Sequence, residues 1–358
     1  GFPDVYGRGV WSAQHASASH GLLVGARMRG VMRTRIVALL VGTALLTTVA
    51  CVSASSTTVR VGEPQPVGTS QRSAFRDGDV QRVVVISAVP AELEQLLGVA
   101  SIERTVEIAG RTHHVGRLEG HPVVLLLTGV SMVNAAAATQ AVIDHFDVGG
   151  IVFSGIAGGV NPSLSIGDVA VPAQWGQHQE MVFARETEDG WDREGRGGEF
   201  ESFGMMFPRG QLIRGGGPEA QERRRQFWFP TDERMLAVAR EVAADITLER
   251  CLPSGDCLQH QPRIVVGGNG VSGPTFVNNA EFREWIWRVF AADAVDMETA
   301  AIGQIAAINR VPFLAFRSLS DLAGGGAGAN EIRLFGRLAA DNSAAVLLEF
   351  LRQWRGPR

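Results

Sequence analysis

Apolar runs alternate with helix-forming segments from residue 81 to the end of the chain. Six short runs are apolar on both faces, as strands buried between two layers are: 82–87, 122–128, 150–154, 263–267, 294–296 and 312–316. Five segments between or after them have helical character: 91–97, 130–146, 279–290, 299–309 and 331–354. This alternation predicts a three-layer α/β/α fold with a central mixed, largely parallel sheet. In such a fold a ligand site is expected beyond the carboxyl ends of the strands.

Residues 177–230 interrupt the alternation with a long stretch that has little periodicity. A stretch of this length inside a compact domain is usually functional or disordered, so a lid, an interface arm and a flexible insertion are all open. Its apolar residues favour an ordered arm: Phe203, Met205, Met206, Phe207, Phe227, Trp228 and Phe229.

The N-terminal region shows the pattern of an export signal. Residues 1–31 have no usable periodicity and are expected to be untranslated or disordered, with translation starting at Met28 or Met32. Residues 32–51 carry arginines, then an apolar run too short to span a bilayer comfortably, then Cys51, which is typical of a signal peptide.

The end of this run, Thr48-Val49-Ala50-Cys51, resembles a bacterial lipoprotein cleavage box. A plain signal peptide and an N-terminal membrane anchor are the alternatives. Residues 52–80 are polar with scattered Pro and Gly and are expected to form a tether. We therefore expect an exported protein, periplasmic or at the cell surface, whose membrane contact is a lipid on Cys51.

Composition narrows the classes of function. Of 358 residues, 45% are hydrophobic, which fills a globular core, and the net charge of −4 gives no basic field for nucleic acid. The three cysteines cannot form a zinc cluster, and neither a metal nor a cofactor is expected.

Cys251 and Cys257 flank a short loop, so an oxidising compartment would favour a disulfide between them, with two free thiols as the alternative.

Three carboxylates follow strands at the same edge of the predicted sheet: Glu92, Glu298 and Asp321. A single acidic residue after a strand is more often a helix cap or a loop hydrogen bonder than a catalyst. Three at one edge, with glycine-rich loops between them, favour a catalytic or binding site.

Five stretches occur in the order and spacing of the nucleoside phosphorylase superfamily. They are SAVPAELEQLL (87–97), SGIAGGVNPSLSIGDVAVP (154–172), SGPTF (272–276), DMETAA (296–301) and RSLSD (317–321). The chain resembles the methylthioadenosine/S-adenosylhomocysteine nucleosidases of that superfamily most, and plant bark-storage proteins as well. This resemblance implies that residues 81–358 form a nucleoside phosphorylase-like catalytic domain with the insertion 177–230.

The resemblance also implies roles for individual residues. Asp321 would be the general acid at purine N7, oriented by Ser320, and Glu92 would activate the water that attacks C1′. Glu298 would bind the ribose hydroxyls, and Arg317 would brace the site. The remaining substrate contacts implied are Met297, Phe276 stacking on the base, the Val277 backbone, Ala157, Gly158 and Met132.

The implied reaction is hydrolysis of the N-glycosidic bond of a purine nucleoside, in a homodimer. A phosphate-dependent phosphorylase and a non-catalytic nucleoside-binding or storage protein are the alternatives. The chain departs from the family pattern at Pro274, where nucleosidases usually carry aspartate, and at Ile156, where many members carry serine.

Overall fold

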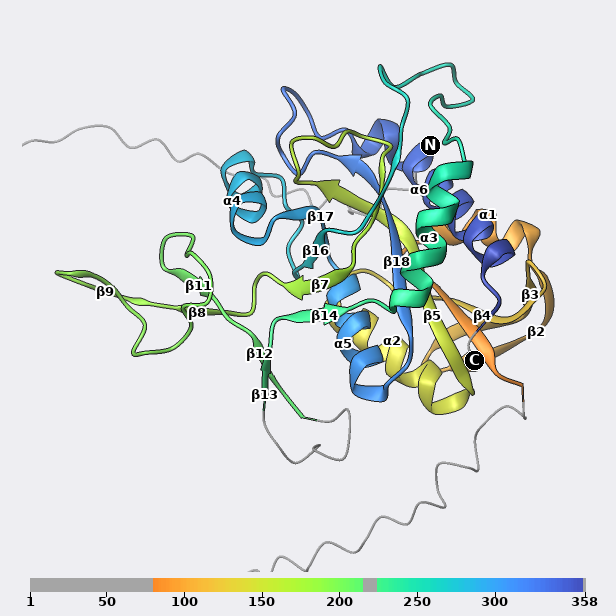
Figure 1. Ribbon diagram of the computed structural model, residues 1–358, viewed down its shortest axis with the longest axis horizontal. Helices are drawn as coiled ribbons and strands as arrows, with labels where there is room; N and C mark the ends of the chain where they lie inside the picture. The colour runs from red at the N-terminus through yellow and green to blue at the C-terminus, as the bar shows by residue number, and fades with distance from the viewer. Residues whose placement is uncertain (1–79, 215–223, 357–358) are drawn as a thin grey trace, which may run out of the picture. The chain divides into compact units, whose positions relative to one another are not determined.

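A twelve-stranded sheet forms the centre of the protein. The computed structural model describes residues 80–214 and 224–356; the expected N-terminal extension, signal peptide and Cys51 lie outside them. The main path of the sheet runs β14-β7-β16-β17-β5-β1-β4-β3-β2, with β18, β6 and β15 joined beside it (Figure 1). Its strands are β1 (Arg82–Ser87), β2 (Ser101–Ile108), β3 (Arg111–Leu118), β4 (His121–Leu127), β5 (Val148–Gly159), β6 (Val169–Val171), β7 (Gln174–Gln177), β14 (Trp228–Pro230), β15 (Ile264–Val266), β16 (Asn269–Ser272), β17 (Ala292–Asp296) and β18 (Phe313–Asp321).

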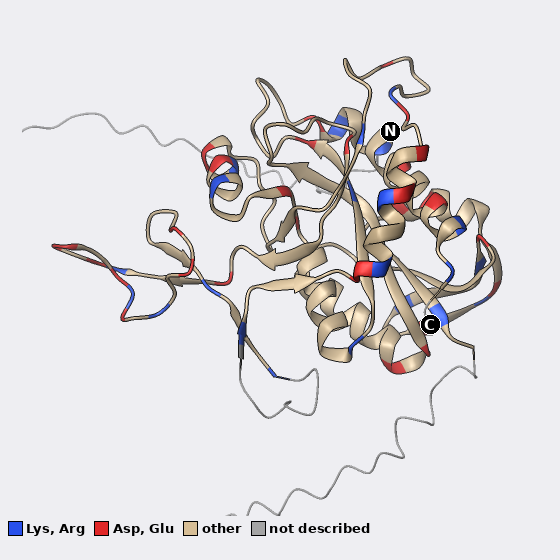
Figure 2. Ribbon diagram, viewed as in Figure 1, with Lys and Arg blue, Asp and Glu red and all other residues tan. Residues whose placement is uncertain are grey.

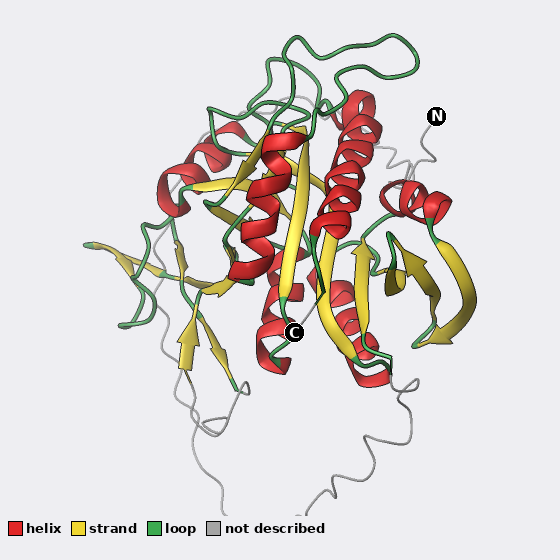
Figure 3. Cartoon of the chain, turned by 45° about the vertical axis from the view of Figure 1, so that its right-hand side comes forward, coloured by secondary structure: helices red, strands yellow, loops and turns green. Residues whose placement is uncertain are grey.

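Helices cover both faces of this sheet. They are α1 (Pro90–Val99), α2 (Met132–His145), α3 (Glu233–Asp245), α4 (Ala280–Phe290), α5 (Thr299–Asn309) and α6 (Ile332–Gln353). Alternate residues of β1 serve the two faces: Val83 and Val85 pack with α1, α3 and α6, while Val84 and Ile86 pack with α2 and α5. The predicted three-layer α/β/α fold with a mixed sheet is therefore confirmed (Figure 3).

Two strands are longer than their apolar runs predict. β5 continues from residue 154 to Gly159, and β18 continues from Phe316 to Asp321. The sequence suggested that the chain leaves the strand at Arg317, but β18 stays paired with β5 in parallel, with Arg317 opposite Gly155 and Asp321 opposite Gly158. Polar residues can continue a buried strand here because their side chains find partners inside the protein.

The β2–β3 hairpin and α3 also went unpredicted. β2 is exposed along most of its length, on both faces, so its sequence lacks the apolar run of a buried strand. Helix α3 buries a single face against α6, with residues such as Met235 and Leu236. Outside that face it has few apolar residues.

The insertion 177–230, called the arm below, begins and ends on the central sheet. β7 and β14 pair antiparallel at its base, with Trp175 opposite Phe229. Beyond β7 and β14 the described part of the arm forms three two-stranded sheets. They are β8 (Met181–Phe183) with β11 (Met206–Pro208), β9 (Arg185–Thr187) with β10 (Gly190–Asp192), and β12 (Gln211–Ile213) with β13 (Arg224–Gln226).

Aromatic side chains anchor the base of the arm on α4. Phe200 and Phe227 have ring centroids 4.3 Å apart, and Phe203 contacts both Phe282 and Trp285 of α4. An ordered arm was predicted from this aromatic content, and its described part has that order. Both acidic and basic residues occur along the arm and on α4 (Figure 2).

The structure contains the predicted disulfide between Cys251 and Cys257, in the segment between α3 and β15. Across residues 80–214 and 224–356, none of the helices is both long and apolar enough to cross a membrane. The same residues include no group of His, Cys, Asp and Glu arranged to hold a metal ion.

Candidate active site

The central strands bring together residues that are far apart in the chain. β1 leads into α1, which carries Glu92 in its first turn. β17 leads into α5, with Glu298 as the residue that precedes the helix. β18 carries Arg317, Ser320 and Asp321; Arg317 and Asp321 pair with β5, and the register shifts between Leu319 and Asp321, where Ser320 lies. The three carboxylates that the sequence placed at one edge of the sheet are thus linked through β5 and β18.

Glu92 is buried and held by backbone N–H groups. Its Oε2 accepts hydrogen bonds from Ala88 N at 2.7 Å and Val89 N at 3.1 Å, and its Oε1 accepts from Ile156 N at 2.9 Å. Burial raises the pKa of this carboxyl group, opposed first by the charge of Arg317 and then by the backbone donors. The arrangement fixes the carboxylate against β5 and makes it a stronger base than an exposed glutamate.

Gly155 allows Glu92 and Arg317 to approach each other. A Cβ at Gly155 would lie 2.4 Å from Arg317 Nη1 and 2.7 Å from Glu92 Oε1. Any larger residue would displace one of the two groups. Gly155 of β5 is therefore a packing requirement of the site.

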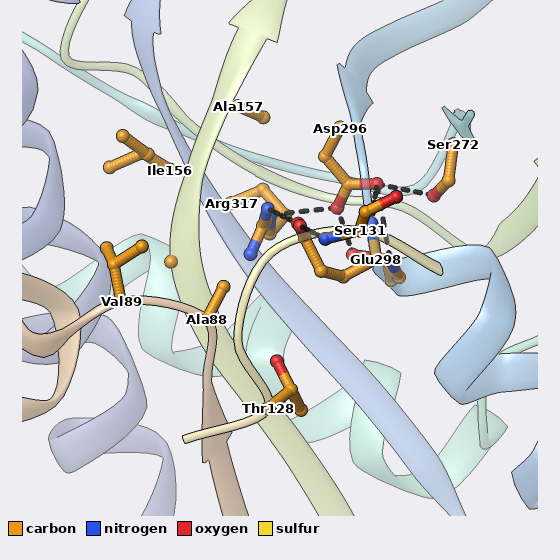
Figure 4. Close-up of polar contacts among 12 residues, drawn as sticks. Ala88, Val89, Thr128, Ser131, Ile156, Ala157, Ser272, Asp296, Glu298 and Arg317 are labelled. Carbon is orange, nitrogen blue, oxygen red and sulfur yellow. Dashed lines mark hydrogen bonds and ion pairs between the residues drawn. The ribbon is translucent and has the colours of Figure 1, made fainter. Parts of the chain in front are cut away.

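Arg317 lies between two carboxylates (Figure 4). Its Nε is 3.0 Å from Asp296 Oδ2, and its Nη2 donates to Glu298 Oε2 at 3.3 Å. The guanidinium also lies over the ring of Phe153, with 4.2 Å from Cζ to the ring centroid. Nη1 has no hydrogen-bond partner within the described residues, although the side chain is almost completely buried.

Glu298 is oriented from two sides. Besides Arg317 on Oε2, its Oε1 accepts a hydrogen bond from Ser131 N at 2.8 Å. Burial raises the pKa of Glu298 to about 7; the charge of Arg317 lowers it, and the neighbouring Asp296 raises it again. A carboxylate with two fixed oxygens suits a vicinal diol, which supplies two hydroxyl donors.

Asp296 is a site residue that the sequence analysis missed. Its Oδ1 accepts from the hydroxyl of Ser272 and from the backbone N of Thr299 at 3.2 Å, and its Oδ2 accepts from the hydroxyl of Thr299. It thereby fixes the start of α5, next to Glu298, while it pairs with Arg317. The sequence shows Asp296 only as an acidic residue at the end of a buried run, and its pairing with Arg317 appears only in the folded chain.

Asp321 ends β18 with each oxygen in a different environment. Oδ2 accepts from Ser320 Oγ at 2.9 Å, and Oδ1 accepts from Ala323 N at 2.8 Å and from Asn330 Nδ2 at 3.2 Å. Burial raises the pKa of Asp321, and these three donors lower it. A carboxyl group whose pKa is raised towards neutrality is suited to act as a general acid.

The small residues of β5 lie beside Asp321. A Cβ at Gly158 would lie 3.4 Å from Asp321 Oδ1, and the carbonyl of Ala157 lies 3.3 Å from Ser320 Oγ. Both residues therefore lie next to Ser320 and Asp321, and their predicted contact with the ligand stays a prediction.

Four further residues implied by the resemblance have apolar side chains. Phe276 follows β16 and is 41% exposed, whereas the adjacent Val277 is buried. Met297 lies half-buried between β17 and α5, and Met132 is the first residue of α2. Their predicted roles in substrate binding stay predictions.

Sequence comparison relates the chain to known proteins. Residues 82–352 match the sequence profile described as the Phosphorylase superfamily. A 5′-methylthioadenosine/S-adenosylhomocysteine nucleosidase of Mycobacterium bovis is 30% identical over 270 residues, covering 75% of this chain and 96% of that protein. Bark storage protein B of Populus deltoides is 25% identical over 273 residues, covering 72% and 82%.

A solved structure resembles the fold as well. It is the 5′-methylthioadenosine/S-adenosylhomocysteine nucleosidase of Neisseria meningitidis in complex with methylthio-immucillin-A, with a TM-score of 0.59 and 26% identity. The match covers 77% of this chain and all of that one. The resemblance inferred from the five motifs is confirmed, and the chain belongs to the Phosphorylase superfamily.

Proposed function

We propose that this protein hydrolyses the N-glycosidic bond of a purine nucleoside. The observation that carries the proposal is the arrangement of Glu92, Glu298 and Asp321 around β5 and β18, with Arg317 between the first two. Each carboxylate has its own set of donors, which supports three different tasks within one reaction.

The first task is protonation of the leaving base. Asp321, protonated, would give its proton to N7 of the purine, so that the base departs as a neutral molecule when the C1′–N9 bond breaks. Its raised pKa supports this task, because a larger fraction of the group carries the proton near neutral pH.

The second and third tasks concern the sugar and the water. Ionised Glu298 would accept hydrogen bonds from the ribose hydroxyls and stabilise the positive charge that develops on the sugar. Glu92 would take a proton from the water whose oxygen forms the new bond to C1′. The products would be the free base and the free sugar.

The charge of the site favours water over phosphate as the nucleophile. One guanidinium, Arg317, faces the three carboxylates of Glu92, Asp296 and Glu298. Asp296 and Glu298 form ion pairs with this guanidinium, and the carboxylate of Glu92 lies near its remaining nitrogen, Nη1. A phosphate anion at this position would be repelled by the excess of negative charge.

The substrate is proposed from relatives together with the site. The nucleosidases that this chain resembles act, by their names, on 5′-methylthioadenosine and S-adenosylhomocysteine. We propose an adenosine-type nucleoside of this class. We also propose that the protein is exported, which the disulfide between Cys251 and Cys257 supports because such bonds persist in oxidising compartments.

The proposal is tested by incubating the purified protein with methylthioadenosine, S-adenosylhomocysteine, adenosine and inosine, with and without phosphate. Release of free base at the same rate in both conditions is the expected result. Base release that requires phosphate would replace hydrolysis with phosphorolysis. Nucleoside binding without any base release would indicate a storage-type protein instead.

A further inference from the structure

Asn330 distinguishes the two oxygens of Asp321. Oδ1 receives hydrogen bonds from Ala323 N and from Asn330 Nδ2, both of which are N–H groups that can only donate. Oδ2 contacts the hydroxyl of Ser320, which can either donate or accept. A proton on the carboxyl group must therefore reside on Oδ2, since Oδ1 is occupied as an acceptor.

The orientation of the Asn330 amide is fixed by a third group. Its Oδ1 accepts a hydrogen bond from Ile332 N at 3.0 Å, at the start of α6. The amide oxygen is thus directed to the helix, and Nδ2 is directed to Asp321. Nδ2 also donates to Asn278 Oδ1 at 3.2 Å.

Asn278 belongs to the segment expected to contact the base. It follows Phe276 and Val277 directly, and the next residue, Asn279, donates its backbone N–H to Ala323 O at 3.1 Å. The two segments pack so closely that a Cβ at Gly324 would lie 2.3 Å from Asn279 N. The loop after the acid and the segment after β16 are therefore one packed unit, with Asn330 bonded to both.

We propose that Asn330 is a positioning residue for Asp321: it keeps the transferable proton on Oδ2 and couples the acid to the segment that contacts the base. The proposal rests on the proposed hydrolysis of a purine nucleoside, in which Asp321 is the acid. Glu331 is the charged neighbour whose effect on Asp321 has the opposite sign, since its negative charge raises the pKa that Asn330 lowers.

Two variants remove the donor in different ways. Asn330→Ala deletes the hydrogen bond to Oδ1, so the pKa of Asp321 rises because its ionised form loses a donor. Asn330→Asp keeps the shape but sets a second carboxyl beside Oδ1, so the pKa rises further. Both should lower kcat by about ten- to a hundredfold, because Oδ1 keeps only the donor of Ala323 and the proton is held less firmly on Oδ2 in the transfer geometry.

The pKa of Asp321 can be read without any enzymatic activity. Infrared difference spectra between each protein and its Asp321→Asn counterpart give the titration of that one carboxyl group. The pKa of Asp321 is expected to be lowest in the wild type, higher in Asn330→Ala and highest in Asn330→Asp. In rate measurements the alkaline limb of kcat should move to higher pH in the same order, since activity is lost as the acid deprotonates.

Asn309→Ala is the matched control. The Asn309 amide also donates two hydrogen bonds, to Gln140 Oε1 and Ile305 O, but at the end of α5. This variant should leave the pKa of Asp321 and the alkaline limb unchanged. An unchanged pKa of Asp321 in both Asn330 variants overturns the proposal, whatever their rates. Wild-type protein that cleaves no nucleoside overturns the proposed function, while the infrared titration still decides the role of Asn330.

Discussion

The backbone N–H of Ser131 donates a hydrogen bond to Glu298 Oε1 at 2.8 Å, across 167 residues of sequence. Ser131 does so with φ 83° and ψ 159°, a conformation that almost only glycine adopts without strain. The strained residue thus lies at the start of α2 and orients the carboxylate proposed to bind the ribose. Backbone strain of this kind concentrates at functional sites.

Replacing Ser131 by glycine should therefore stabilise the protein and preserve the donor. We expect the free energy of unfolding to rise by about 1 kcal/mol, with kcat/KM close to wild type. Chemical denaturation and steady-state kinetics measure both. As a control, Ser101→Gly in the exposed strand β2 should destabilise by roughly 0.5–1 kcal/mol. Destabilisation by Ser131→Gly would show that the strain is absent.

Asp321→Asn should lower kcat by about 10²–10⁴-fold while nucleoside binding survives. Asparagine retains the size and can still accept the N–H bonds on one oxygen, but it has no proton to transfer. Turnover and the Kd of the substrate are measured separately. Asp293→Asn is the control, because Asp293 is also buried with a raised pKa but accepts from Asn161 outside the site. Wild-type turnover in Asp321→Asn would exclude this residue as the acid.

Glu298 should give the protein a stability that decreases towards alkaline pH. Its pKa is raised from 4.5 to about 7 in the folded state, so its contribution is present below pH 4.5 and is lost as the pH rises through about 7. Glu298→Gln removes this titration. The Tm of the variant relative to wild type should therefore increase between pH 5 and pH 8. A difference in Tm that is independent of pH would contradict the raised pKa.

The same group should shape the pH dependence of the reaction. Ionised Glu298 is the form proposed to bind the ribose, so wild-type kcat/KM should rise as the pH increases through about 7. In Glu298→Gln this rise should disappear, and binding and rate should weaken together.

The arm should form the interface of a homodimer. Its apolar side chains include Phe183, 66% exposed, and Leu212, 49% exposed, which a monomer would leave in water. Light scattering should give the mass of two chains at micromolar concentration. The double variant Phe183→Ser/Leu212→Ser should shift the protein towards a monomer, whereas Glu186→Gln on the same arm should not. A wild-type monomer would contradict the prediction.

The mature protein should be found outside the cytoplasm with both thiols oxidised. Arg33, Arg35 and the apolar run before Cys51 predict export, and Cys251 and Cys257 are already bonded in the structure. Cell fractionation locates the protein, and thiol titration without reductant should find neither of these two cysteines free. Uncleaved protein in the cytosol would refute the export prediction. Incorporation of a labelled lipid into the mature protein would establish the modification of Cys51.

The sequence revealed the layers and the three carboxylates because both follow from local patterns. Buried strands have apolar runs, and Glu92, Glu298 and Asp321 stand at or beyond the ends of such runs. Asp296 and Asn330 went unnoticed for a physical reason. The importance of each depends on partners 21 and 9 residues away, Arg317 and Asp321, that only the folded chain brings near. The polar ends of β5 and β18 were missed because pairing, rather than apolar content, keeps them in the sheet.

The pairing of β7 with β14 has a consequence for how this chain can change. Because Trp175 lies opposite Phe229, the two ends of the arm leave the sheet side by side. Chain can therefore be added or removed beyond that point at a small cost in loop-closure entropy, and without moving the strands that carry the carboxylates. The arm is thus a place where relatives of this protein can differ in length and acquire new surfaces while the chemistry of the sheet edge stays constant.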